Sequence, residues 1–133
     1  MSVIKFWRVW AILLGLSLMV GETIRSWGQG RNPLFVLDDF FVGLALVVTA
    51  ILMARPSIPR LCAFSSSFAA SAGMLYGSFF GKLVDLSKPA SSDIEIRLLT
   101  ALIGLAFTSS ILGIFGSIRA SSSVGIRNIK INS

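Results

Sequence analysis

Residues 21–41 read GETIRSWGQGRNPLFVLDDFF and decide where the first two helices end and begin. Two apolar runs flank this segment, which itself holds five charged residues: Glu22, Arg25, Arg31, Asp38 and Asp39. The pair Asn32-Pro33 is typical of a helix start, with asparagine as the N-cap and proline at the first helical position. A helix that starts at Pro33 includes Asp38 and Asp39, so these two acids are expected in a helix and not in a loop.

The composition of the chain is that of a membrane protein. Of 133 residues, 54% are hydrophobic and 14% are charged, whereas soluble domains carry about a quarter charged residues. A chain this short has too little interior to bury so much apolar surface. The surplus apolar surface therefore predicts an integral membrane protein.

Four uncharged runs give the positions of the helices. Residues 9–21, 40–54, 61–81 and 98–118 form runs of 13, 15, 21 and 21 residues. A helix needs about 20 residues to cross a membrane, so the first two spans must include charged residues of segment 21–41. We predict an all-α, integral membrane four-helix bundle with spans at about 7–27, 33–54, 60–81 and 96–118. The remaining residues, 119–133, are predicted to form a flexible basic tail.

The distribution of charge predicts the orientation in the membrane. Four spans place both termini on one side, and that side holds seven of the 12 lysine and arginine residues and none of the six acids. Under the positive-inside rule that side is cytoplasmic. The net charge of +6 is then a topology signal, and no nucleic-acid partner is expected. The compact plan and the charge bias favour a bacterial inner membrane.

The N-terminal run has a second interpretation as a cleaved signal peptide. Lys5 and Arg8 would form its basic region, but no A-x-A-like cleavage site follows the apolar run. We therefore expect this run to remain as the first helix.

Several classes of active site are excluded by residue type. The chain has no histidine and one cysteine, which argues against zinc, haem and copper sites and removes histidine-based nucleophilic catalysis. We expect no enzymatic activity, no metal and no cofactor.

The charged residues of segment 21–41 are predicted to lie at one height in the membrane. Arg25 is 17 residues after Arg8, and Asp39 is 16 residues before Arg55. At about 1.5 Å per residue these separations are about 25 and 24 Å. If Arg8 and Arg55 mark the cytoplasmic boundary, Arg25 and Asp39 lie at nearly the same height in the membrane.

An ionised side chain at this depth is costly unless it is paired. We predict that Arg25 is the centre of a charge cluster, with Glu22 and either Asp38 or Asp39 as its partners and Arg31 as an additional partner. Two interpretations stay open. The cluster either locks the first two helices together, or its excess of acid forms a cation or proton site.

Small residues recur at every fourth position of the third helix. This glycine stripe consists of Ser65, Ala69, Gly73, Gly77 and Gly81. Such spacing lets two helix backbones approach closely. The fourth helix has a matching series at Ser109, Gly113 and Ser117. We favour packing of the two series against each other, and the alternative is an interface with a partner or a second copy.

These features predict a non-enzymatic accessory or interaction subunit of a larger membrane complex. Its expected partners are the lipid bilayer and another membrane protein or a second copy of itself. The alternative is a small cation- or proton-coupled transporter or channel subunit that acts as an oligomer.

Overall fold

The computed structural model describes residues 3–27, 33–86 and 94–131, which form four α-helices with no strand among them. The helices are α1 (Val3–Ser26), α2 (Pro33–Leu52), α3 (Ile58–Leu86) and α4 (Ile94–Ile131). The prediction of an all-α protein with four helices is confirmed.

Local signals explain where α2 and α3 begin. Helix α2 starts at Pro33, as the N-cap pattern predicts. Ser57 precedes α3 as its N-cap residue, and its carbonyl oxygen accepts a hydrogen bond from the backbone N–H of Leu61 at 2.9 Å. Arg60 Nη1 donates to the carbonyl oxygen of Arg55 at 2.7 Å and closes the turn between α2 and α3.

Helices α3 and α4 continue past the C-terminal ends of their predicted spans. Helix α3 continues to Leu86, so Lys82 lies in the helix although the predicted span ends at residue 81. Helix α4 continues to Ile131, through most of the predicted basic tail. Neither extension contains proline, so the backbone hydrogen bonding of each helix can continue past the apolar run.

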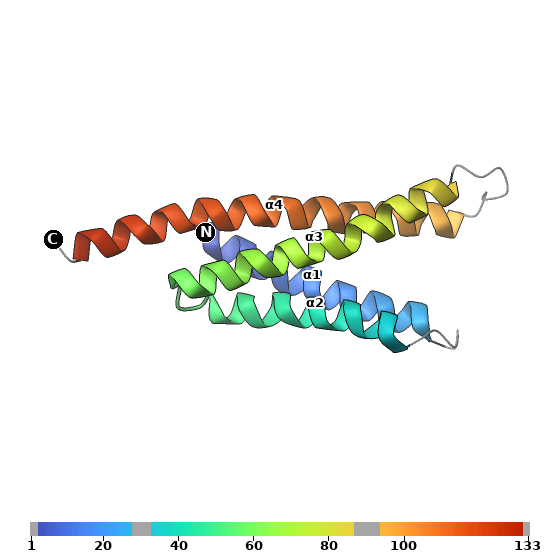
Figure 1. Cartoon of the computed structure of the whole chain (residues 1–133), viewed down its shortest axis with the longest axis horizontal. Coiled ribbons are helices and arrows are strands. Elements are labelled where there is room, and N and C mark those ends of the chain that lie inside the picture. The colour runs from blue at the N-terminus through green and yellow to red at the C-terminus, as the bar shows by residue number, and fades with distance from the viewer. Residues whose placement is uncertain (1–2, 28–32, 87–93, 132–133) are drawn as a thin grey trace.

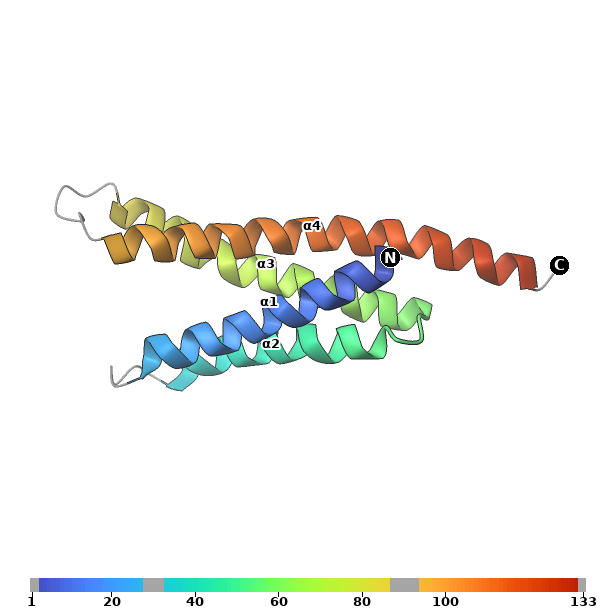
Figure 2. The same cartoon turned by 180° about the vertical axis from the view of Figure 1, so that it is seen from behind.

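The four helices form two antiparallel hairpins, α1 with α2 and α3 with α4. Figures 1 and 2 show that the hairpins lie close together near residues 53–57 and diverge toward the end of α1 and the start of α2. We call the first region the closed end and the second the open end.

Aromatic and aliphatic side chains fill the closed end. The largest fully buried side chains include Phe64, Phe68, Leu46 and Met53. The rings of Phe64 and Phe68 meet edge to face at 5.1 Å, and Trp7 meets Phe68 in the same way at 6.2 Å. All four helices therefore share one core, to which α4 contributes Ala120.

A pair of glycines brings α1 and α2 into close contact. A Cβ atom built on Gly15 would lie 2.5 Å from the carbonyl oxygen of Gly43, and one built on Gly43 would lie 2.7 Å from that of Gly15. Only glycine at both positions permits this approach, because the obstacle to a side chain is backbone.

The small residues of α4 pack against α3, as predicted for that series. Ser109, Gly113 and Ser117 are buried. A Cβ on Gly113 would collide with the ring of Phe68, and Ser117 Oγ donates to Ser65 Oγ at 3.0 Å.

Hydroxyl groups also connect the helices. Ser71 Oγ and Ser110 Oγ lie 2.9 Å apart between α3 and α4, and Thr49 Oγ1 and Ser67 Oγ lie 2.8 Å apart between α2 and α3. In an apolar environment such bonds satisfy polar groups that would otherwise lack partners.

Candidate functional site

The charge cluster begins in the last two turns of α1. Glu22 is 3% exposed, and its Oε2 lies 3.8 Å from Nη1 of Arg25, whose side chain is 34% exposed. Arg25 lies in the final turn of the helix, where a cation is favoured by the exposed carbonyl groups. The buried acid therefore has a partly exposed basic partner.

Asp39 joins this pair from α2. Its carboxyl group is half-buried and lies within hydrogen-bonding reach of the carboxyl group of Glu22. Two acidic side chains and one guanidinium group therefore lie close together where α1 meets α2.

The other predicted members of the cluster are placed differently. Asp38 is exposed, because successive residues of a helix point about 100° apart and Asp39 takes the inward direction. Arg31 lies outside the described residues.

Glu22, and not Arg25, is the centre of the cluster. Glu22 contacts both Arg25 and Asp39. It lies three residues before Arg25, about 4.5 Å deeper along α1, and it is the member of this pair that meets the carboxyl group of Asp39. The predicted central position of Arg25 is corrected accordingly.

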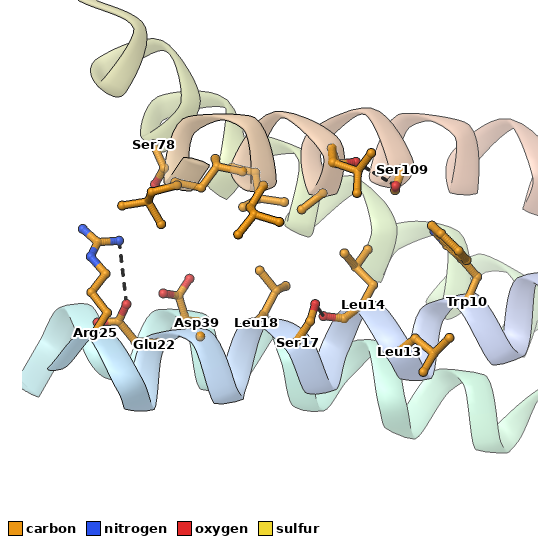
Figure 3. Close-up of a pocket in the computed structure, with 17 residues that line it drawn as sticks. Trp10, Leu13, Leu14, Ser17, Leu18, Glu22, Arg25, Asp39, Ser78 and Ser109 are labelled. Atoms are coloured by element: carbon orange, nitrogen blue, oxygen red, sulfur yellow. Dashed lines mark hydrogen bonds and ion pairs between the residues drawn. The ribbon is translucent and has the colours of Figure 1, made fainter. Parts of the chain in front are cut away.

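The cluster borders a cleft of about 430 Å³ between the two hairpins. Figure 3 shows Asp39, Leu18 and Leu14 pointing across it toward the opposite helices. Of the 17 lining residues, eleven are apolar or glycine, and most lie on α1 and α4. The polar lining residues are Glu22, Arg25, Asp39, Ser17, Ser78 and Ser109.

Away from the acids the cleft is apolar in character. Ser17 Oγ donates to the carbonyl oxygen of Leu14 at 2.8 Å, and Ser109 Oγ donates to that of Leu105 at 2.7 Å. These hydroxyl hydrogens are thus used within their own helices. Trp10 lines the end of the cleft farthest from Arg25 (Figure 3).

The glycine stripe of α3 faces away from the bundle. Ala69, Gly73, Gly77 and Gly81 are exposed, and a Cβ atom on any of the three glycines would meet nothing within 4 Å. The predicted packing of this stripe against α4 is therefore wrong from Ala69 onward. Helix α3 contacts α4 through its other face, which carries the large aromatic side chains of the core.

Sequence reasoning did not find the cleft, although a signal was present. Trp10, Leu14, Leu18 and Glu22 follow one another at intervals of four residues. This spacing places a buried acid at the end of an apolar face of α1.

No group of three or more acidic or cysteine side chains among the described residues is arranged to hold a metal ion. No protein-family profile, curated protein or solved structure matches this chain.

Proposed function

We propose that the chain is a multi-pass protein of a bacterial inner membrane, with four spans and both termini in the cytoplasm. Two helical segments, Val3–Ser26 and Arg97–Ser121, are long and apolar enough to cross a bilayer. In the most apolar stretch of each segment only 17% and 28% of the residues are buried. The core helix of a soluble protein would be mostly buried. Lipid around these helices would accommodate the exposed leucine, valine and phenylalanine side chains.

The hairpins extend this argument to the other two helices. Helix α2 packs antiparallel to α1, and α3 packs antiparallel to α4. Insertion of α1 and α4 would carry α2 and α3 into the bilayer with them. With 20 and 29 residues, these helices are about 30 and 43 Å long, which is sufficient to cross it.

Within that membrane we propose an accessory or interaction role, carried by the exposed glycine stripe. A row of glycines costs helix stability and here supports no contact within the described chain. Another transmembrane helix could approach its backbone closely, and in lipid such packing is a main source of association. The partner is another membrane protein or a second copy of this chain.

The substitution Gly77→Leu tests this role. The added side chain would hold a partner helix away, so we expect the variant to lose its partner or its oligomeric state. Native mass spectrometry after mild extraction from the native membrane measures the stoichiometry. The matched control is Ala101→Leu, at an exposed position of α4. Unchanged stoichiometry with Gly77→Leu would contradict the proposal.

A second candidate function is cation- or proton-coupled transport, or a channel subunit, by an oligomer of this chain. The observation that favours it is the position of the acids at an open cleft. Glu22 and Asp39 both line that cleft, Glu22 as a buried side chain and Asp39 as a half-buried one. Cation-dependent proton movement in proteoliposomes, abolished by Glu22→Gln, would support transport.

A further inference from the structure

We propose that the cleft binds an amphipathic organic cation, with its ammonium group against the carboxyl groups of Glu22 and Asp39 and its apolar body among the leucines of α1 and α4. The inference gives a substrate class to the transport candidate. It does not depend on the glycine stripe, which lies on the outer face of α3.

The size of the cleft fits a small molecule. Its volume of about 430 Å³ is within the range of about 300–1,000 Å³ found for small-molecule pockets.

The charges that line the cleft favour a cation. Glu22 and Asp39 are both acidic, and the single base, Arg25, is already paired with Glu22. An anionic ligand would be placed against two carboxyl groups, which repel it. An ammonium group can instead donate hydrogen bonds to the carboxyl groups of both Glu22 and Asp39.

The rest of the lining favours an organic ligand over a metal ion. Seven of the lining residues are leucines, which offer no ligand atom to a hard cation. Ser17 and Ser109 donate their hydroxyl hydrogens to their own helices. Trp10 lies 12 residues from Glu22, or about 18 Å along α1, and it offers an aromatic surface to the far end of the ligand.

The charged groups around the pair of acids are Arg25 on α1 and Asp38 on α2. The lining that α3 and α4 contribute is uncharged. The charge of the cleft is therefore set by Glu22, Asp39 and Arg25 alone among its lining residues.

The test uses the purified full chain in phosphatidylcholine nanodiscs, with empty nanodiscs as the blank. The probes are 4-phenylbutylamine and 4-phenylbutyrate, which have nearly the same size and opposite charge. Titration calorimetry is expected to show saturable binding of the amine only. Equal binding of the carboxylate would overturn the proposal, because the cleft would then accept any amphiphile.

Variants identify the groups responsible. Glu22→Gln and Asp39→Asn should each weaken amine binding by about tenfold or more, because each removes a charge-assisted contact. Asp38→Asn is the matched control on the exposed side of α2, with an expected change of less than about twofold. A loss with Asp38→Asn as large as that with Asp39→Asn would contradict the assignment.

A second kind of variant keeps the charges and fills the space. Leu18 points into the cleft (Figure 3), and Leu18→Trp should abolish amine binding while Glu22, Arg25 and Asp39 remain. Retained affinity in this variant would place the amine elsewhere and overturn the proposal. It also provides a test if Glu22→Gln does not fold.

Transport and binding are distinguished by the assay. Amine binding in nanodiscs without amine-dependent proton movement in proteoliposomes would leave this inference standing and remove the transport candidate.

Discussion

The closed and open ends of the molecule use aromatic residues in different ways. At the closed end Phe68 contacts Trp7 of the other hairpin and joins the two hairpins. At the open end Phe79 stacks on Phe107 at 6.0 Å, which joins α3 to α4 only. Both ends contain large aromatic rings. The difference between them is whether a ring contacts the other hairpin or a helix of its own hairpin.

This difference explains why one end has a core and the other has a cleft. Rings that bridge two hairpins fill the space between them, whereas rings used inside one hairpin leave that space to shorter side chains such as Leu14 and Leu18. The stability of the bundle should therefore depend on the closed end, and the open end should tolerate change.

The largest effect is expected from Phe68→Ala. Phe68 is fully buried where both hairpins meet, and its truncation should lower the free energy of unfolding by about 3 kcal/mol because it leaves a cavity. Leu102→Ala at the cleft is the control, since Leu102 is 55% exposed, and should cost less than about 1 kcal/mol. Circular dichroism during unfolding in sodium dodecyl sulfate measures both. Similar losses for the two variants would contradict the contrast between the ends.

An intermediate effect is expected from Gly43→Leu. The new side chain would meet the carbonyl oxygen of Gly15, which cannot rotate away as a side chain can, so the cost should be about 2 kcal/mol. Gly73→Leu is the matched control, because its added atoms meet open space. Unfolding of both variants in the same detergent compares them, and a destabilised Gly73→Leu would mean that the stripe is packed in the isolated chain.

The smallest effect is expected for the hydroxyl pair of Ser71 and Ser110. A double-mutant cycle with alanine at both positions should give a coupling energy of about 0.6 kcal/mol, as is typical of hydrogen bonds between helices in membranes. Ser109→Ala is the control for a hydroxyl that donates only within its own helix, and pairing it with Ser71→Ala should give no coupling. Coupling of the same size in both cycles would rule out a specific bond between the two hydroxyls.

The number and order of helices could be predicted because the signals are local. Pro33 marks the start of α2, and the uncharged runs give the apolar part of each helix. The helix ends were harder to predict. The predicted spans ended with the uncharged runs, yet the charged and serine-rich residues that follow continue α3 and α4, because nothing in those segments interrupts backbone hydrogen bonding.

The candidate site could be predicted only in part, since rotation and tilt are not local properties. Spacing brought Glu22, Arg25 and the two aspartates to one height, but only the rotation of α2 decides that Asp39 points inward. Spacing also identified the glycine stripe, but it could not show which helix packs against it. In the structure α4 packs on the face of α3 that carries Phe68, and the glycines lie on another face. The cleft depends on the angle between the two hairpins. This angle cannot be predicted from the sequence of one helix, because it results from packing among several helices.

The divergence of the hairpins gives the molecule a wedge shape, narrow at the turn between α2 and α3 and wide at the other end. In the proposed orientation the wide end lies in the outer leaflet of the bilayer. The protein would then displace more lipid area from the outer leaflet than from the inner one. Such an asymmetry couples the protein to membrane curvature, and closing the cleft would reduce it.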